Sequence, residues 1–246
     1  MRSWALVTGA TAGIGESFTR LLAANDYNIV LVARDLPRLS ERAAALQESY
    51  GIETVVLQAD LATDSGCALI ESFIADNEID VLINNAGFGI NKAFTVSALD
   101  AEQNLLDVLV RTPMRLMHVA LPGMKVRDRG IIINVSSVAG FMAGGTYSAS
   151  KSYLTVLSES LHTELAGTKV IISALCPGFT RTEFHQRGRM SMKGLPAFMW
   201  LNADKLVAKA WSDALKGKAI SIPGWQYTLL TLVMTIAPRP MVRKIG

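Results

Sequence analysis

The 246-residue sequence has few of the residues that mark disordered, disulfide-rich or metal-binding proteins. Its only two cysteines, Cys67 and Cys176, are far apart and form neither a disulfide framework nor a zinc-ligand pattern. Charged residues make up 18% and prolines number 8, whereas 50% of the residues are apolar, which excludes a disordered or fibrous chain. These shortages favour a folded protein in a reducing compartment, and we expect the cytoplasm.

No apolar run in the sequence is long enough to cross a bilayer. The longest stretch near the C-terminus, residues 229–237, is far shorter than the about 20 residues that a transmembrane helix needs. A glycine-rich segment begins after the first eight residues, so we expect no signal peptide. A chain of this size removes roughly 70–75% of its extended surface from water. We therefore expect one α/β domain over residues 1–246.

Acidic residues are scarce in the last quarter of the chain. Residues 181–246 hold 11 Lys or Arg and 3 Asp or Glu, whereas residues 1–180 hold 13 and 18, and the net charge is +3. A solvated basic face over an ordinary core is the simplest interpretation. The alternative is a basic, apolar surface that meets an anionic or membrane-borne substrate. Because there is no dense basic stripe with a recognition motif, we expect no nucleic-acid partner.

Short β-branched runs alternate with longer helical patterns along the chain. The runs are nearly continuous in Val, Ile and Leu, as in strands that are buried on both faces. Repeated strand–helix–strand units imply right-handed crossovers. The sequence therefore predicts an α/β, Rossmann-like doubly wound parallel sheet of about seven strands with helices on both faces. Predicted strands cover residues 5–8, 28–33, 54–58, 80–84, 130–136, 169–175 and 219–222, and predicted helices residues 13–25, 36–49, 64–77, 98–124, 146–166 and 203–215.

A glycine-rich turn follows the first predicted strand. Three glycines stand in the segment TGATAGIG at residues 8–15, directly before a predicted helix. Glycines let the backbone approach a pyrophosphate, and the free N–H groups at the helix start stabilise its charge. The segment predicts a dinucleotide site that is formed by Gly9, Thr11, Gly13, Ile14 and Gly15.

Arg34 follows the second predicted strand, about twenty residues beyond the last of these glycines. At this place in a dinucleotide fold, an acidic side chain binds a ribose 2′-hydroxyl, whereas an arginine pairs with a 2′-phosphate. Arg34 therefore favours NADP(H) over NAD(H) as the cofactor. Arg38, one helical turn further on, is either a second phosphate contact or part of a solvated helix start. We expect Asp35 to serve the helix N-terminus.

Further motifs follow the fourth, fifth and sixth predicted strands. They are NNAG at residues 84–87, a serine pair at 136–137, YSASK at 147–151 and CPGFTRT at 176–182. Together with the glycine-rich turn and in this order, they resemble the short-chain dehydrogenase/reductase family. The marks of that family are TGxxxGxG, NNAG, a serine after the fifth strand, YxxxK and a PG pair after the sixth. The resemblance covers almost the whole chain, from residue 6 to about residue 222.

The resemblance implies three catalytic residues. Tyr147 and Lys151 are four residues apart on one helix face, and the ammonium is expected to lower the pKa of the phenol from about 10. Tyr147 exchanges a proton with the substrate oxygen while the nicotinamide exchanges a hydride with its carbon. Ser137 holds the substrate carbonyl, with Ser136 as a second candidate. The resemblance implies no metal site, and it implies cofactor contacts from Asp60, Leu61, Asn85, Ala86, Gly87, Tyr147, Lys151, Pro177, Gly178, Thr180 and Thr182.

Two departures from the family pattern concern the catalytic residues. Leu109 stands where family members carry an asparagine that completes a catalytic tetrad. In the family, the main-chain carbonyl of that residue holds a water of the proton relay, and Leu109 keeps its carbonyl. We therefore expect an altered relay rather than lost activity. Ser137 and Tyr147 are ten residues apart, fewer than is usual, so residues 141–146 must close a shortened loop through Gly144 and Gly145.

Two segments flank the expected substrate cleft. Residues 183–201 correspond to the family's substrate lid, and their Met and aromatic side chains suit apolar ligands, although permanent packing on the core or on another subunit is the alternative. Residues 223–246 are an apolar and basic C-terminal extension, which we expect to pack within the oligomer or over the cleft rather than on a membrane surface. A homodimer or homotetramer is predicted from apolar residues on several helix faces, namely Leu105, Leu109, Leu116, Leu154, Leu157 and Leu161, and from the pairing of these helices in the family.

The sequence therefore predicts an NADPH-dependent oxidoreductase. Its substrate is an apolar ketone, aldehyde or 3-oxoacyl compound that is reduced reversibly to the alcohol, with Tyr147 as the general acid and base. The alternative is a catalytically weak NADP-binding sensor or scaffold of the same fold. Leu109 and the shortened loop favour this alternative, whereas the intact Tyr147 and Lys151 oppose it.

Overall fold

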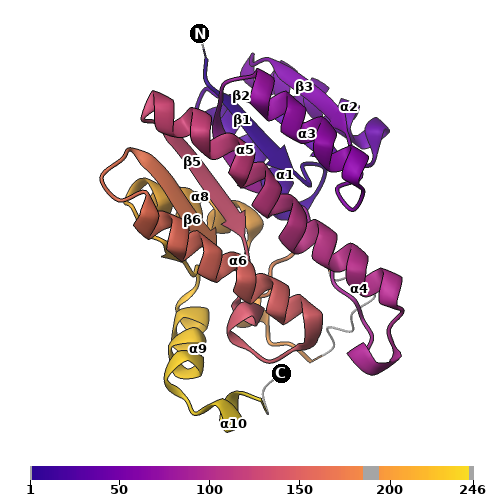
Figure 1. The fold of residues 1–246 in the computed structure, drawn as a ribbon, viewed down its shortest axis with the longest axis vertical. Coiled ribbons are helices and arrows are strands. Elements are labelled where there is room, and N and C mark those ends of the chain that lie inside the picture. The colour runs from indigo at the N-terminus through magenta and orange to yellow at the C-terminus, as the bar shows by residue number, and fades with distance from the viewer. Residues whose placement is uncertain (1, 185–193, 244–246) are drawn as a thin grey trace.

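A parallel seven-stranded sheet forms the centre of the computed structural model, which describes residues 2–184 and 194–243 (Figure 1). The strands lie in the order β3-β2-β1-β4-β5-β6-β7, and every neighbouring pair is parallel. The predicted Rossmann-like, doubly wound fold is confirmed, and no strand end differs from its predicted place by more than one residue. The strands are β1 (Trp4–Thr8), β2 (Asn28–Ala33), β3 (Thr54–Gln58), β4 (Ile79–Asn84), β5 (Gly130–Val135), β6 (Val170–Leu175) and β7 (Ile220–Ser221).

Helices connect the strands and follow the last one. The predicted helices are present, although one of them is interrupted. The α-helices are α1 (Gly13–Ala24), α2 (Leu36–Tyr50), α3 (Asp64–Asp76), α4 (Leu99–Leu106), α5 (Thr112–Arg127), α6 (Gly145–Glu164), α8 (Ala203–Leu215), α9 (Trp225–Ile236) and α10 (Arg239–Val242). Shorter helical segments are η1 (Phe94–Val96), η2 (Asp107–Arg111), η3 (Val138–Phe141) and η4 (Ala197–Met199).

Two layers of helices cover the two faces of the sheet. Successive residues of a strand point to opposite faces. Ala5 and Val7 of β1 pack with residues of α1, α2 and α8, whereas Leu6 packs with residues of α3, α5 and α6. Large side chains such as Phe18 and Ile70 are fully buried in these layers, and each contributes about 1.5–3 kcal/mol on leaving water. The two apolar layers therefore hold the carboxyl edge of the sheet in place.

The segment after β2 contains the signals that start and stop α2. The Asp35 carboxylate accepts the N–H of Arg38 at 3.1 Å, as an N-cap does. Pro37 lies in the first turn, where a missing N–H costs no hydrogen bond. The helix ends at Tyr50 and is capped by Gly51, whose φ of 62° is left-handed. Asp35 thus serves the helix N-terminus, as predicted.

The predicted helix over residues 98–124 is interrupted by the π-helical segment η2, which separates α4 from α5. Pro113 explains the interruption. It has no N–H to donate to the carbonyl of Leu109, and its ring collides with that carbonyl in a regular α-helix. Segments of this kind are frequent at functional sites, and Leu109 lies in the middle of this one.

The C-terminal helices α9 and α10 lie beyond the carboxyl edge of the sheet, below α6 in Figure 1. One side of α9 is buried through Tyr227, Thr231 and Met234. None of the helices within the described residues is long and apolar enough to cross a membrane. The opposite side of α9 is an exposed apolar stripe that consists of Trp225, Leu229, Leu232, Val233 and Ile236.

Candidate active site

The glycine-rich turn lies at the carboxyl edge of the sheet and has no room for side chains. Gly9 and Gly13 have φ angles of 67° and 57°, which residues with a Cβ rarely adopt. A Cβ on Gly15 would lie 2.2 Å from the Gly9 carbonyl oxygen, and one on Gly13 would lie 2.9 Å from Thr182. No side chain caps the N-terminus of α1. The Gly9 and Ala10 N–H groups donate to the Val32 carbonyl, whereas the backbone N–H groups at the start of α1 have no side-chain cap, as a pyrophosphate requires.

The NNAG segment after β4 is hydrogen-bonded to this turn. The Thr8 hydroxyl accepts the backbone N–H groups of Asn85 and Ala86 at 2.9 and 3.0 Å. The Asn85 amide donates to the carbonyl oxygens of Thr8 and Gly9 at 2.9 and 3.2 Å. We expected the Asn85 side chain to contact the cofactor. Its amide N–H groups instead donate to the turn and stabilise the shape of the turn.

The two arginines that follow β2 differ in whether they form an ion pair. Arg34 is exposed and makes no ion pair with any described residue, and its carbonyl accepts the Gln58 amide at 2.9 Å. Arg38 forms a bidentate ion pair with Glu183, with N···O distances of 3.1 and 2.9 Å. Arg34 is thus available to a 2′-phosphate, whereas Arg38, the second predicted contact, is already paired in this structure.

Ser137, Tyr147 and Lys151 come together at the carboxyl end of β5. Ser137 caps η3 and accepts the Ala139 N–H at 3.1 Å. Tyr147 and Lys151 lie at the start of α6, and the Lys151 Nζ is 5.7 Å from the centroid of the Tyr147 ring. The ammonium also donates to the Val135 carbonyl at 2.7 Å. The structure therefore brings the three predicted catalytic residues to one place.

Ser136, the other candidate serine, is buried between α6 and the sheet. Its hydroxyl donates to the Lys151 carbonyl at 2.7 Å and forms a hydrogen bond of 2.7 Å with the Thr155 hydroxyl. The Ser137 hydroxyl instead acts on Tyr147, because its hydrogen bond partly lowers the pKa of the phenol. The geometry favours Ser137 for the substrate-binding role.

Loss of solvation controls the protonation of Tyr147 and Lys151. Desolvation raises the pKa of Tyr147 to about 12 and outweighs the opposite effect of Ser137. Desolvation also lowers the pKa of Lys151 to about 8. The predicted lowering of the Tyr147 pKa by the ammonium is therefore wrong for this structure. At neutral pH Tyr147 carries its proton, so it is able to donate it to a substrate oxygen.

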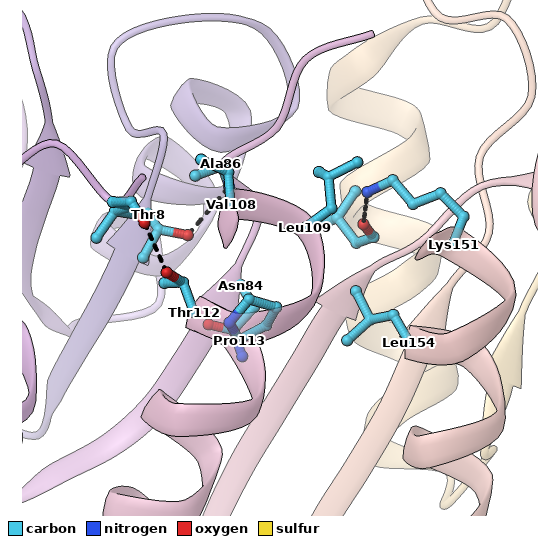
Figure 2. A pocket seen from close by; sticks show the side chains of 11 residues that line it. Thr8, Asn84, Ala86, Val108, Leu109, Thr112, Pro113, Lys151 and Leu154 are labelled. Atoms are coloured by element: carbon cyan, nitrogen blue, oxygen red, sulfur yellow. Dashed lines mark hydrogen bonds between the residues drawn. The ribbon is translucent and has the colours of Figure 1, made fainter. Parts of the chain in front are cut away.

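Leu109 fills the place of the expected tetrad asparagine and is 1% exposed. Its side chain lies beside Lys151 in Figure 2, and a Cβ on Gly87 would lie 2.8 Å from its Cδ2. Leu109 and Lys151 line a cavity of about 10 Å³, the size of one water molecule. Because Pro113 cannot donate to the Leu109 carbonyl, this oxygen is able to accept a hydrogen bond from a relay water.

The shortened loop between Ser137 and Tyr147 closes through η3 and two glycines. Ala143, Gly144 and Gly145 are exposed, and Gly145 has a φ of 66°. The predicted need for glycine holds at Gly145, since this φ favours glycine, whereas Gly144 has a φ of −120° that other residues adopt as well.

The segment after β6 is held against the C-terminal helix α9. A Cβ on Gly178 would lie 2.0 Å from the ring of Tyr227. The buried Tyr227 hydroxyl donates to the Met199 carbonyl at 2.5 Å and accepts the Phe179 N–H at 2.9 Å. The buried side of α9 therefore packs on the segment that we expect to contact the nicotinamide.

The predicted lid, residues 183–201, is described only in part, since residues 185–193 lie outside the described residues. At its start, the Phe184 ring lies 6.0 Å from the Tyr147 ring. At its end, the Trp200 ring lies 6.1 Å from the Phe179 ring. The aromatic ring of Phe184 thus borders the phenol, which is compatible with an apolar substrate.

The other predicted cofactor residues lie at the ends of β1, β3, β4 and β6. The Thr180 hydroxyl donates to the Gly178 carbonyl at 3.0 Å, and the Thr182 hydroxyl accepts the Phe184 N–H at 3.3 Å. The Leu61 carbonyl accepts the Thr112 hydroxyl at 2.7 Å. Thr11, Leu61, Pro177 and Thr180 are buried, Ile14, Ala86, Gly178 and Thr182 are partly buried, and Asp60 and Gly87 are exposed.

Reasoning from the sequence missed three residues that shape this site. They are Pro113, which interrupts the helix at Leu109, Glu183, which pairs with Arg38, and Tyr227, which packs on Gly178. Two of them carry a signal in the sequence: Pro113 stands inside a helical pattern, and Glu183 is one of three acidic residues in 181–246. Within residues 2–184 and 194–243, no group of three or more His, Cys, Asp or Glu side chains is placed to hold a metal ion.

A sequence profile of the short chain dehydrogenase family matches residues 3–192. The chain belongs to the short-chain dehydrogenase/reductase family. It is similar to hydroxysteroid dehydrogenase-like protein 1 of Gallus gallus, with 30% identity over 92% of this chain and 69% of that protein. A very-long-chain 3-oxoacyl-CoA reductase of Coprinopsis cinerea is 29% identical over 97% of this chain and 73% of its own length.

Among solved structures, a short-chain dehydrogenase from Sphingobium yanoikuyae in complex with NADPH is similar to this chain. It has a TM-score of 0.87 and 29% identity, and the match covers 96% of both chains. The 246-residue chain is therefore an oxidoreductase with the nucleotide-binding fold of the family. Its Gly9 turn, NNAG segment and Tyr147–Lys151 pair occupy one edge of the sheet.

Proposed function

We propose that this short-chain dehydrogenase reduces an apolar ketone, aldehyde or 3-oxoacyl group to the alcohol with NADPH, reversibly. The observation that carries the proposal is the convergence of Ser137, Tyr147 and Lys151 at the edge that also holds the bare glycine turn. Two similar proteins support the substrate class and the cofactor, since one is named a 3-oxoacyl-CoA reductase and the other is in complex with NADPH.

The residues present fit a nicotinamide dinucleotide. Gly9, Gly13 and Gly15 leave the space next to the uncapped start of α1 that a pyrophosphate needs. Arg34 would hold the 2′-phosphate, and Lys151 would hold the nicotinamide ribose. When bound, the cofactor supplies the hydride.

The protein's own residues handle the proton and the orientation of the substrate. Ser137 donates a hydrogen bond to the substrate oxygen and places it beside the phenol. Tyr147 donates its proton to that oxygen, since its pKa of about 12 keeps it protonated at neutral pH. The Lys151 ammonium, held by the Val135 carbonyl, stabilises the phenolate that remains.

Steady oxidation of NADPH with a panel of carbonyl compounds tests this function. We expect turnover with apolar ketones, aldehydes or 3-oxoacyl thioesters, and none with small charged carbonyl compounds. If NADPH binds but no member of the panel is turned over, the alternative of a weakly catalytic NADP-binding sensor or scaffold replaces the proposal. Two buried, free cysteines support a cytoplasmic location as part of the proposal.

Leu109→Asn restores the amide that the family carries at this place. Because the Leu109 carbonyl already serves the relay, we expect kcat to stay unchanged or rise by up to about threefold. Leu106→Asn, the same change at a half-exposed site one residue before η2, is the control in the same assay. A fall in kcat of more than tenfold for Leu109→Asn alone would show that the leucine is needed for catalysis.

The proposal includes a homodimer or homotetramer, on different grounds from those first expected. Leu105, Leu109, Leu116 and Leu154 are buried within the protomer, and Leu157 and Leu161 are partly buried, so they form no outward face. Other apolar side chains are exposed instead, namely Met114, Tyr153 and Val156 on α5 and α6 and the exposed apolar stripe of α9. An isologous contact between two copies would cover such surfaces.

Ile236→Glu tests what covers the α9 stripe, since Ile236 is 75% exposed and its replacement leaves the core intact. We expect the wild type to sediment as a dimer or tetramer and Ile236→Glu to shift towards monomer. Val126→Glu, at an 88% exposed valine on α5, should change nothing. Arg239 and Arg243 next to the stripe make an anionic membrane surface the alternative occupant. Salt-sensitive cosedimentation with anionic vesicles, lost in Ile236→Glu, would establish that alternative.

A further inference from the structure

The ion pair between Arg38 and Glu183 joins two segments that serve different parts of the cofactor. Arg38 lies in the first turn of α2, four residues after Arg34, which the proposed function assigns to the 2′-phosphate. Glu183 directly follows Thr182, whose side chain packs against Gly13 of the glycine-rich turn. The pair is bidentate, with N···O distances of 3.1 and 2.9 Å, and its side chains are 30% and 44% exposed.

The carboxylate occupies the end of the Arg38 guanidinium and leaves the Nε–H edge as the remaining bidentate edge for a phosphate. The pair occupies Nη1 and Nη2, the atoms through which an arginine binds two oxygens of an anion side by side. A 2′-phosphate must therefore displace Glu183 or bind next to a pair without net charge. Displacement requires that the ion pair be broken, and binding next to the pair puts two anions on one guanidinium, so in both cases the carboxylate opposes the phosphate.

Stability is a weak reason for this pair to exist. A partly exposed ion pair contributes little to the stability of the fold, because water screens its charges. The start of α2 is already fixed by the Asp35 cap and by Pro37. The position of the helix therefore does not depend on Glu183. The main effect of the Glu183 carboxylate is on the affinity of Arg38 for an anionic ligand.

We propose that Glu183 is a specificity-determining residue that limits the preference for NADP(H) over NAD(H) by neutralising Arg38. Arg34 then provides the discrimination between the two cofactors, and Arg38 adds little while Glu183 is present. The inference rests on the proposed use of NADP(H). It assigns a role to a residue that follows β6 and lies 145 residues along the chain from Arg38, outside the strand end that ordinarily selects the cofactor.

Glu183→Gln removes the charge and keeps the size of the side chain. By calorimetry on the full chain without substrate, we expect NADP⁺ to bind about threefold to tenfold more tightly. NAD⁺ has no 2′-phosphate, so its Kd should change by less than about twofold. The control is Glu41→Gln, which makes the same change of charge on the exposed face of α2, where Glu41 contacts Arg42.

A second pair of variants separates neutralisation from other effects of Glu183. Arg38→Gln should weaken NADP⁺ binding by less than about twofold in the wild-type background. In the Glu183→Gln background, the same change should abolish the whole gain in affinity, because Arg38 is then the group that provides it.

Each outcome of these titrations has a distinct meaning. If Glu183→Gln weakens the binding of NADP⁺ and NAD⁺ equally, the ion pair helps to hold either cofactor. If both affinities are unchanged, the ion pair has no role in cofactor binding. Either result overturns the inference. A wild type that binds neither dinucleotide overturns the proposed function itself. A wild type that prefers NADP⁺ with Glu183→Gln indistinguishable from it leaves the proposed function standing and removes only this inference.

Discussion

Tyr147→Phe should lower kcat by roughly 10²–10⁴, the usual contribution of a positioned general acid. The change removes one hydroxyl oxygen and leaves the ring that packs 6.0 Å from Phe184, so the cleft keeps its shape. NADPH should still bind with an affinity within about threefold of the wild type, because the glycine-rich turn and Arg34 are untouched. The loss then appears in kcat and not in cofactor binding.

Tyr153→Phe is the matched control for this measurement. Tyr153 lies on the same helix, α6, and its side chain is 38% exposed. The same hydroxyl is removed outside the catalytic group, so turnover should remain that of the wild type. Full kcat in Tyr147→Phe would falsify the role of the phenol, and a matching loss in Tyr153→Phe would point to damage of α6 instead.

Most of the fold was predictable because each local signal agrees with the sheet. The runs that end at Thr8, Ala33 and Asn84 are apolar on both faces, and a continuous apolar run of this length suits little else than a central parallel strand. The helix after Asp35 is equally clear, since its cap, its Pro37 and its final glycine stand at the expected places.

The interruption of the long fourth helix was less accessible from the sequence. Apolar periodicity continues through residues 98–124 and hides the break, because a π-helical turn shifts the pattern by a single residue. Pro113 was the available signal, since a proline inside a helical pattern removes the bond to the carbonyl four residues earlier. That carbonyl belongs to Leu109, so the break and the departure from the family pattern lie at one point.

The candidate site was predictable as a set of residues but not in its electrostatics. Motif order placed Tyr147 and Lys151 on one helix face, and the structure has them there. The direction of the Tyr147 pKa depends on how much water the fold removes from the phenol, which spacing along the chain does not reveal. The pairing of Arg38 with Glu183 depends on a contact across 145 residues, and no local rule sets such a contact.

Arg34→Asp should reverse the cofactor preference. The wild type should bind NADP⁺ at least about tenfold more tightly than NAD⁺, which corresponds to about 1.4 kcal/mol from one charge-assisted contact with the 2′-phosphate. In the variant, the carboxylate repels that phosphate and accepts hydrogen bonds from the ribose hydroxyls of NAD⁺. We expect NAD⁺ to become the tighter ligand by about tenfold, a change of about a hundredfold in the ratio of the two affinities.

Calorimetric titrations of both dinucleotides against wild type and variant measure this ratio directly. Arg34 is exposed and makes no ion pair with any residue that the structure describes, so its replacement should leave the melting temperature nearly unchanged. Arg239→Asp, the same change at an exposed arginine of α10, controls for the loss of net positive charge. Equal affinities of the wild type for NADP⁺ and NAD⁺ would remove Arg34 from the phosphate site. A variant that loses both ligands would instead show that Arg34 holds a part of the cofactor common to the two, since the 2′-phosphate is the group in which they differ.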